Sequence, residues 1–490
     1  MPAAFGHIRR ACTRRHAAMA AAAATAALAP AAPAHASSGQ VTIVQDDTQV
    51  LRRDAATRDA ALDEYRSLGA DVLKIMVFWG EVAGPNAGEY PEENWKRYDE
   101  AIVAAQTRGL RVMATLGGRA PSWASQGDGG HRDPNPDEFQ KFVQAAGSRW
   151  GGGPYMDPMN PGATRPRIDL WSIWNEPNLS SWLSPQYKGS TPYSPHLYRR
   201  LLVAAKAGLD ASGHASDQLM IGELLPFVRE RSSKNKISPV HFLRELACVD
   251  SKYRPLTGKS ASARGCDGFQ PLPGTGLAIH PYTFAGGPRA PVSHKDDVTI
   301  ASLGRLTSAL DKLDKRGRLA NKRIPLWITE FGFQTDPPDP FQADIAKVPG
   351  FMGQSERYAY ANKRVASYSH YTLIDDPVEG KGNARYSGWQ GGLRFSNGKA
   401  KSGVYRAFQL PFFAVLRSSS SVEVFGGARA GAAGQTVEVQ VRSGKKYKRL
   451  ATLKLGGAGY FRKVLKLSSA KNRTLRFVYA GRASNAQKPS

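Results

Sequence analysis

The chain has 490 residues, of which 41% are hydrophobic and 22% charged. These values are ordinary for a globular protein, and they exclude a disordered or fibrous chain. The length accommodates one large domain and one small domain. The formal net charge is +26, but no nucleic-acid-binding motif accompanies it, so we expect no nucleic-acid partner.

The N-terminal segment differs from the rest of the chain. It carries basic residues at Arg9, Arg10, Arg14 and Arg15 and then a small apolar stretch, Ala17–Ala29. Ala34-His35-Ala36 follows as a small-residue cleavage site. This order predicts a secretory signal peptide over residues 1–36 and therefore a secreted, extracellular protein. The apolar stretch is shorter than the ~20 residues that a spanning helix needs, so no membrane span is expected after cleavage.

Two cysteines, Cys248 and Cys266, remain once Cys12 has left with the signal peptide. In an oxidising compartment an even number of cysteines favours a disulfide. The alternative is a pair of independent buried thiols. A metal site is a weaker interpretation, because the chain has no C-x-x-C motif with a nearby histidine pair.

Short apolar runs alternate with amphipathic stretches through most of the chain. One helix face is indicated by Trp95, Tyr98, Ile102 and Ala105, which are spaced at 3 or 4 residues. Strand–helix alternation indicates parallel strands with helical crossovers. Eight such units predict an α/β fold, a (β/α)₈ barrel over residues 37–417. A doubly wound open sheet is the alternative, but no G-x-G-x-x-G motif follows an early strand. The expected strands are Val41–Gln45, Val72–Phe78, Arg111–Leu116, Ile168–Trp174, Leu219–Gly222, Leu277–His280, Pro325–Thr329 and Ala366–Leu373.

Three long segments rich in Gly, Pro and Asp are expected to be loops: Gly127–Glu138, Gly151–Arg167 and Asp336–Gln354. The first and third follow a strand, which places them at the C-terminal face, where barrel enzymes bind their substrates. The second precedes the fourth strand and is expected at the opposite end.

The pattern changes near Ser418. Val437, Val439 and Val441 alternate with polar residues, and glycines punctuate the segment. This alternation predicts a small antiparallel β-sandwich over residues 418–490, joined to the barrel by a linker at Ser418–Ser421. We expect it to fold separately and to be dispensable for small substrates. From Val422 onward there are 15 Lys and Arg against two Glu, a net charge of +13. A module of this charge is suited to an anionic cell-wall or extracellular polymer, although a solvated basic surface without a partner has the same composition.

Two predicted strands end in a glutamate. In Asp169–Asn178 an apolar run stops at Asn175-Glu176-Pro177, and in Pro325–Gly332 a second run stops at Glu330. Because the carboxyl ends of barrel strands meet at one mouth, we expect Glu176 and Glu330 to face each other. Hydrolysis of a glycosidic bond needs two such carboxylates, one to protonate the leaving oxygen and one to attack the anomeric carbon.

The W-N-E-P-N and W-I-T-E-F-G motifs resemble those of clan A glycoside hydrolases, the retaining barrel superfamily that includes families 5 and 39. His280-Pro281-Tyr282 is similar to the H-x-Y of that clan. The resemblance covers roughly residues 40–415. It implies Glu176 as acid/base, Glu330 as nucleophile, Asn175 as a ligand of the sugar 2-hydroxyl, and Tyr282 as the residue that orients the nucleophile.

The chain also departs from that clan. Lys74 stands on the second strand where many members have an arginine, and Tyr371 is the expected substitute for a tryptophan at the end of the eighth strand. His280, Trp79 and Trp123 are further candidates for substrate binding, and Trp182 is a candidate for stacking on a sugar ring. Glu81 and Glu223 also follow strands, but we interpret them as non-catalytic.

The sequence therefore predicts a secreted retaining glycosidase, an O-glycosyl hydrolase acting on a polysaccharide or oligosaccharide. The alternatives are a non-catalytic carbohydrate-binding protein on an inherited barrel and a wall-associated adhesin. The first of these predicts loss of at least one glutamate, and both are present. No metal or organic cofactor is expected, because two carboxylates suffice for the reaction.

Overall fold

The computed structural model describes residues 39–127, 129–154, 164–227, 234–292 and 294–490. The predicted signal peptide lies outside the described residues.

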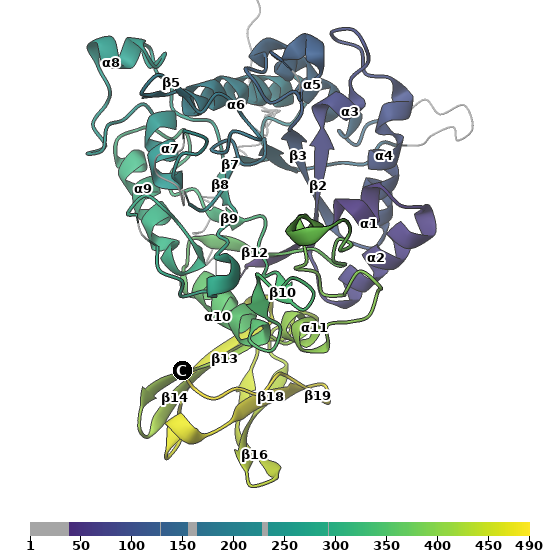
Figure 1. The fold of residues 1–490 in the computed structure, drawn as a ribbon, viewed down its shortest axis with the longest axis vertical. Helices are drawn as coiled ribbons and strands as arrows, with labels where there is room; N and C mark the ends of the chain where they lie inside the picture. Colours follow the sequence, from purple (N-terminus) through teal and green to yellow (C-terminus); the bar gives the residue numbers. More distant parts are fainter. Residues whose placement is uncertain (1–38, 128, 155–163, 228–233, 293) are drawn as a thin grey trace, which may run out of the picture. The chain divides into compact units, whose positions relative to one another are not determined.

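Eight parallel strands close into a barrel in the order β1-β12-β9-β8-β7-β4-β3-β2 (Figure 1). All eight lie where the sequence predicts them, within a few residues at each end. Their bounds are β1 (Val41–Gln45), β2 (Val72–Phe78), β3 (Arg111–Gly117), β4 (Leu170–Ile173), β7 (Gln218–Leu224), β8 (Gly276–Ile279), β9 (Leu326–Ile328) and β12 (Val365–Tyr371).

Helices follow the strands and surround the barrel (Figure 1). The predicted apolar face of α4 is buried, from Trp95 to Ala105. Asn135 caps α5, since its side chain accepts a hydrogen bond from the Asp137 amide at 2.8 Å. The longer helices are α2 (Ala55–Ser67), α4 (Glu92–Thr107), α5 (Pro136–Arg149), α6 (Ser194–Ala211), α7 (Pro239–Leu246), α9 (Gly304–Lys315), α10 (Val348–Ala361) and α11 (Ser402–Gln409), and the short ones are α1 (Asp47–Leu51), α3 (Trp79–Val82) and α8 (Gly258–Ser262).

A layer of apolar side chains fills the barrel interior. Seven strands contribute one buried residue each: Ile43, Val72, Met113, Leu170, Met220, Ala278 and Trp327. Each of these residues precedes the polar residues at or beyond the C-terminal end of the same strand, so the layer lies on the N-terminal side of the barrel mouth. The C-terminal end is left for polar side chains, as in other barrels of this kind.

Two of the three expected loops contain regular structure. Helix α5 begins inside the first, at Pro136. The third holds a two-stranded sheet, β10 (Thr335–Asp336) with β11 (Ala343–Asp344), and the start of α10. In the second expected loop, an isolated β-bridge between Gly151 and Arg167 joins the two described ends. A further two-stranded sheet, β5 (Tyr187–Lys188) with β6 (Thr191–Pro192), follows β4.

The C-terminal region forms two antiparallel sheets, as predicted. One has the order β13-β14-β17 and the other β16-β15-β18-β19, and a separate hydrophobic core lies between them. The bounds are β13 (Phe412–Ser418), β14 (Ser421–Gly427), β15 (Thr436–Ser443), β16 (Lys446–Lys454), β17 (Tyr460–Lys466), β18 (Leu475–Tyr479) and β19 (Arg482–Ala483).

The expected linker at Ser418–Ser421 is wrong. These serines form the turn of the β13–β14 hairpin, in which Ser418 pairs with Ser421. The first strand of the sandwich therefore begins at Phe412, before the predicted boundary. A serine-rich turn and a serine-rich linker have the same composition, which is why the sequence did not distinguish them.

A buried ion pair joins the sandwich to the barrel. Glu356 of α10 binds Arg429, which follows β14, at 2.7 Å, and both side chains are almost fully buried. Arg429 also donates to Thr42 Oγ1 of β1 at 2.7 Å and to the Phe408 carbonyl at 2.6 Å. Tyr460 of β17 donates to Glu356. Burial raises the pKa of Glu356, and Arg429 offsets part of that effect.

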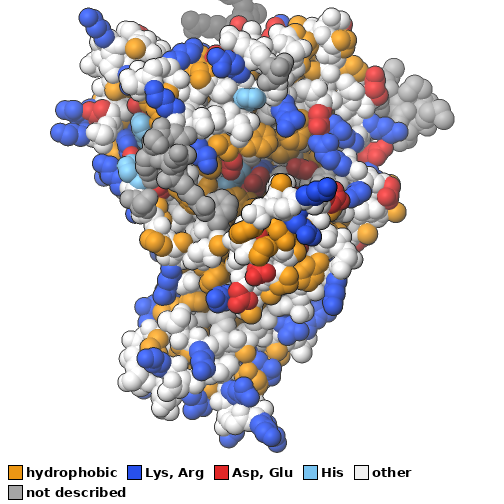
Figure 2. Space-filling view, in the orientation of Figure 1, with side chains coloured by type: hydrophobic (Ala, Val, Ile, Leu, Met, Phe, Trp, Pro, Cys, Tyr) orange, Lys and Arg blue, Asp and Glu red, His pale blue; other side chains and the backbone are white. Residues whose placement is uncertain are grey.

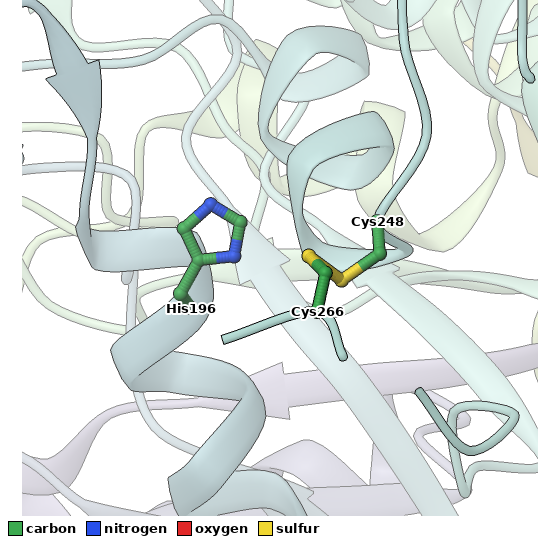
Figure 3. A group of neighbouring side chains, drawn as sticks. All are labelled: His196, Cys248 and Cys266. Carbon is green, nitrogen blue, oxygen red and sulfur yellow. A yellow bond between two sulfur atoms is a disulfide. The ribbon is translucent and has the colours of Figure 1, made fainter. Parts of the chain in front are cut away.

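The predicted disulfide is confirmed between Cys248 and Cys266, in the connection from α7 to β8 (Figure 3). This connection lies at the N-terminal end of the strands, away from the barrel mouth. His196 of α6 lies beside it (Figure 3) and bonds Glu245 through Nε2 at 3.1 Å and Arg199 through Nδ1 at 3.0 Å. Since both sulfurs are in the disulfide and both ring nitrogens are bonded, this group does not form a metal site.

We expect Arg429→Met to destabilise the protein, because the sandwich still covers Glu356, which then lacks its cationic partner. Loss of one partner from a buried ion pair typically costs about 3–5 kcal/mol. Urea unfolding of Arg429→Met should show this loss. Adding Glu356→Gln to Arg429→Met should restore part of it, whereas Glu356→Gln alone should destabilise. An unchanged urea midpoint for Arg429→Met would contradict the role of the pair.

Removal of the disulfide by Cys248→Ala with Cys266→Ala should lower the free energy of unfolding by about 3 kcal/mol, the chain-entropy value for a loop of this size. The closed loop spans 18 residues. Thermal unfolding of the double variant should match that of the reduced wild-type chain, and both should keep their catalytic turnover. Loss of turnover at temperatures where the variant remains folded would contradict the predicted distance from the site.

Candidate active site

Five ionisable side chains converge at the C-terminal mouth of the barrel. Glu176 follows β4, His280 follows β8 and Glu330 follows β9, while Lys74 lies within β2 and Glu223 within β7. In the space-filling view, acidic and histidine side chains line the hollow at this mouth (Figure 2). Glu176 and Glu330 keep 14% of their side-chain surface exposed, whereas Lys74, Glu223 and His280 are fully buried. The two predicted catalytic residues are therefore the members of the group that solvent and a ligand reach.

The chain turns sharply where β4 ends. Trp174 and Glu176 have φ angles of 63° and 38°, which are uncommon for residues with a side chain. Trp174 is buried and donates from Nε1 to the Trp182 carbonyl at 2.8 Å. It packs closely on Gly117, where a Cβ would lie 2.7 Å from the indole ring. This tight packing fixes the turn that presents Glu176, consistent with strained backbone held by its surroundings.

His280 connects the two exposed carboxylates. Its Nδ1 lies 3.0 Å from Glu176 Oε1 and 3.4 Å from Glu330 Oε2. Those two oxygens therefore lie no more than about 6.4 Å apart, the two distances placed end to end. The predicted pair of glutamates thus does face each other across the mouth, with one imidazole between them.

Glu223 is the most extensively bonded carboxylate of the site. It accepts from Lys74 Nζ at 2.6 Å, from Thr115 Oγ1 at 2.9 Å and from His280 Nε2 at 3.2 Å. The amide of Asn175, with Nδ2 directed at Glu223, adds a fourth donor at 3.2 Å. One buried carboxylate thereby holds side chains from β2, β3 and β8 and from the turn after β4.

Lys74 links Glu223 to Glu330. Its Nζ lies 2.6 Å from Glu223 and 3.0 Å from Glu330 Oε1. Lys74, which the sequence marked as a departure, therefore contacts the second predicted catalytic residue directly. Burial lowers the pKa of Lys74, but the charges of Glu223 and Glu330 outweigh burial and raise the pKa above its ordinary value.

The same contacts fix the charges of Glu223 and His280. Burial raises the pKa of Glu223, but Lys74 and His280 outweigh it and bring the pKa to about 2. Burial lowers the pKa of His280, but Glu330, Glu176 and Glu223 outweigh it and raise the pKa to about 9. At neutral pH, Glu223 is a carboxylate and His280 is an imidazolium that donates from both nitrogens. His280 contributes its full stabilisation of the folded state at pH values below the pKa that it has in the unfolded chain. This stabilisation is lost as the pH rises through about 9, its pKa in the folded state.

Glu223, His280 and Glu330 offer ligand atoms within 4.8 Å of one another, a spacing that suits a metal ion. The Lys74 ammonium, however, already bonds two of the three. Within the described part of the chain, this group has its positive charge supplied by Lys74 and His280 and does not fit an additional cation.

Two predicted tyrosines lie beside Glu330. Tyr282 donates from its hydroxyl to Glu330 Oε2 at 3.3 Å, as the resemblance implied. Tyr371 ends β12, and Trp389, which the sequence analysis missed, donates from Nε1 to its carbonyl at 2.7 Å. The Trp389 ring packs on Tyr282 and Tyr371 at centroid distances of 5.2 and 5.5 Å. A tryptophan therefore does reach this side of the mouth, but from a loop after the eighth strand.

The prediction of Trp79 as a substrate-binding residue is wrong. Trp79 is fully buried and stacks on Phe142 of α5 at 5.7 Å. Trp123 is partly buried and bonds the Gly84 carbonyl at 3.1 Å, behind the mouth. Trp182 is the better placed tryptophan, since its Nε1 lies 3.3 Å from the Asn175 side-chain oxygen.

A pocket of about 580 Å³ opens beside Trp182, within the usual size range of ligand sites. Phe78, at the end of β2, stacks on Trp182 with ring centroids 6.4 Å apart. Other lining residues are Arg52, Gly80, Glu81, Arg119, Ala120, Pro121, Ser122, Gly127, Gly129 and Gly130. Because Trp182 also contacts Asn175, the pocket extends the mouth on the side of β2 and β3.

Asp46 and Asp47, directly after β1, were also missed. Burial raises the pKa of Asp46 to about 7 and that of Asp47 to about 6. Asp46 accepts from the amides of Leu373 and Ile374 at 3.1 and 3.2 Å and so holds the chain after β12. The sequence feature that could have identified Asp46 and Asp47 is the pair of adjacent carboxylates directly after a predicted strand. Glu81, in contrast, bonds Arg52 and Arg97 at 2.9 and 2.6 Å at the rim.

No family model and no curated protein matches the sequence. Among solved structures, the GH39 enzyme from Xanthomonas axonopodis pv. citri aligns over 92% of this chain and 94% of its own, with 12% identity and a TM-score of 0.50. The GH30 endoxylanase from Clostridium papyrosolvens C71 aligns over 90% and 96%, with 13% identity and a TM-score of 0.43. A family 1 β-glucosidase from Thermotoga maritima aligns over 73% and 92%, with 12% identity and a TM-score of 0.44.

The fold is therefore the (β/α)₈ barrel that clan A glycoside hydrolases share, as the two glutamate motifs predicted. At these identities the likeness concerns the fold, and the chemistry has to be argued from the site.

Replacing Glu223 by Gln should lower the pKa of His280 from about 9, by at least about one unit, because the imidazolium loses one of its anionic partners. Titration of ¹³C-labelled histidines by NMR measures this shift directly. Glu81→Gln removes a rim carboxylate of the same type and should leave the titration of His280 unchanged. An unaltered pKa in Glu223→Gln would contradict the assigned coupling.

Proposed function

We propose that this protein is a retaining glycoside hydrolase in which Glu176 is the acid/base and Glu330 the nucleophile. The observation that carries the proposal is the spacing of the two exposed carboxylates, because Glu176 Oε1 and Glu330 Oε2 lie within about 6.4 Å of each other across the barrel mouth. Retaining enzymes separate their carboxyl groups by about 5–5.5 Å and inverting enzymes by about 6.5–9.5 Å. The upper limit set by His280 is compatible with the shorter separation, at which a glutamate attacks the anomeric carbon directly.

The contacts of Glu330 suit a nucleophile. Lys74 at 3.0 Å stabilises the negative charge that attack requires, and Tyr282 at 3.3 Å orients the second oxygen. In the first step Glu330 attacks the anomeric carbon and forms a glycosyl ester, while the bond to the leaving oxygen breaks. The leaving oxygen takes its proton from Glu176.

The contacts of Glu176 suit an acid/base. Its side chain is bonded by His280 at 3.0 Å and by no other described ionisable side chain. In the second step Glu176 removes a proton from water, which attacks the anomeric carbon, and Glu330 leaves. Two displacements at one carbon retain its configuration.

The substrate is proposed to be an oligosaccharide or polysaccharide. Asn175, directly before Glu176 and anchored by Glu223 and Trp182, is proposed to bind the 2-hydroxyl of the sugar. Phe78 and Trp182 offer aromatic surface in the adjoining pocket, on which a further sugar ring can stack. Tyr371 and Trp389 form the opposite wall, next to Glu330.

We further propose that the protein is secreted, on the basis of residues 1–36 and the Cys248–Cys266 disulfide, which forms in oxidising compartments. The described helices include none with the length and apolar character of a membrane span.

The two proposed roles depend differently on the leaving group of the substrate, and this difference provides the test. A dinitrophenyl group leaves without protonation, so Glu176→Ala should keep much of its first-step rate on a dinitrophenyl glycoside. On an alkyl glycoside it should lose about 10²–10⁴-fold, the usual value of acid assistance. Added azide should accelerate its second step, because this anion needs no general base. Glu330→Ala should be inactive on both substrates.

Stopped-flow release of dinitrophenolate and NMR of the first product decide the assignment. Glu100→Ala, on the exposed surface of α4 and outside the pocket lining, is the matched control and should behave as wild type. An exchange of the two behaviours would reverse the roles, and an inverted first product would refute the retaining mechanism.

A further inference from the structure

The four-stranded sheet of the C-terminal region has one buried face and one solvent face. On β15, Val437, Val439 and Val441 are buried in the core between the two sheets. Successive side chains of a strand point to opposite faces, so Glu438, Gln440 and Arg442 lie on the solvent face. The partner residues opposite them on β16 and β18 share that face.

The strand register gathers cations there. Gln440 pairs with Arg449 of β16 on one side and with Arg476 of β18 on the other, and Arg442 pairs with Tyr447. The Arg476 guanidinium lies 3.8 Å from the centroid of the Tyr447 ring and donates to Gln440 at 2.8 Å. Arg442, Arg449 and Arg476, with Tyr447, are called the arginine face below.

The carboxylates of this region do not neutralise the arginine face. From Val422 onward the sequence has only Glu423 and Glu438 as acids. Glu423 is 3% exposed and is bound by Arg357, Arg417 and Arg462 at the other sheet. Glu438 accepts a bond from Gln440 at 2.6 Å. In the described part of the chain, no salt bridge involves Arg442, Arg449 or Arg476. Figure 2 shows Lys and Arg, and hardly any Asp or Glu, over the C-terminal strands.

Arg449 and Arg476 lie on either side of Gln440, so their charges flank a neutral residue of the central strand. Arg449 and Arg476 lie two strand spacings apart, or about 9–10 Å. A row of this width fits a polymer with repeated anionic groups better than one small anion. Guanidinium groups bind carboxylates and sulfates through two parallel hydrogen bonds, which favours arginine at such a surface.

We propose that the arginine face binds an anionic polysaccharide. A nucleic acid is the less suitable polyanion, because single-stranded bases need exposed aromatic rings to stack on. The one aromatic side chain of the arginine face, all of whose residues the structure describes, is Tyr447, and Arg476 already covers its ring. The site lies outside the barrel mouth and uses neither Glu176 nor Glu330, so it holds the protein on a polymer independently of the proposed hydrolysis.

The test is binding of the full chain to polygalacturonate, measured by affinity electrophoresis at low and high salt. Arg442→Ser, Arg449→Ser and Arg476→Ser together should weaken binding at least about tenfold at low salt. The matched control replaces Lys463, Lys466 and Lys471 by Ser, removing the same charge from the region of β17 and the turn that follows it. Binding by wild type should weaken steeply as salt screens the charges.

Tight, salt-sensitive binding that the arginine substitutions abolish and the lysine substitutions leave largely intact supports the proposal. Equal losses in both variants would show a general charge effect and overturn the arginine face. Binding that is insensitive to salt, or equally tight to neutral amylose, or tighter to single-stranded DNA, would overturn the anionic polysaccharide as its partner. Circular dichroism and unchanged turnover of an aryl glycoside establish that both variants are folded. Because binding is read without catalysis, failure here and failure of the proposed hydrolysis are distinguishable.

Discussion

The buried contact between Lys74 and Glu223 is the interaction on which the site depends. At 2.6 Å, with both side chains fully buried, each group removes the need for solvent around the other. Glu223 also accepts hydrogen bonds from His280, Thr115 and Asn175. Lys74 also donates a hydrogen bond to Glu330. Every side chain that the proposed mechanism uses is bonded to this pair or is one step from it. The two glutamates at the mouth therefore rest on a layer of fixed charges, and the apolar layer below it closes the barrel.

The proposed division of labour follows from how that layer is arranged. Glu330 lies against an ammonium and a phenol, which favour a stable anion in one orientation. Glu176 lies on a strained turn, and its contact with an ionisable side chain is the one with His280. Preorganised charges of this kind need no rearrangement when the reaction begins. Lys74, where the sequence resemblance leads one to expect an arginine, thus places a fully buried cation 3.0 Å from Glu330.

The local sequence was sufficient to predict the positions of the barrel strands and of the two glutamates at the mouth. Each strand is an apolar run, and each of the two glutamates stands where such a run stops. The local sequence was insufficient for Glu223, whose importance arises from contacts with residues on three other strands. Trp79 was misassigned for the same reason, since the aromatic residues that bury it belong to α5. The boundary of the sandwich was placed too late because four serines are compatible with a linker and with a hairpin turn. In each case the deciding contact joins residues far apart in the chain, which a single sequence does not display.

The position of Arg429 has a consequence for the order of events during synthesis. This residue lies near the C-terminus, yet its guanidinium bonds Thr42 on the first strand and Glu356 on the last barrel helix but one. The first strand emerges from the ribosome long before Arg429 does. Until Arg429 is present, Glu356 is either protonated or in contact with water. The contact that joins β1 and α10 through Arg429 can therefore form only when about seven eighths of the chain has been made.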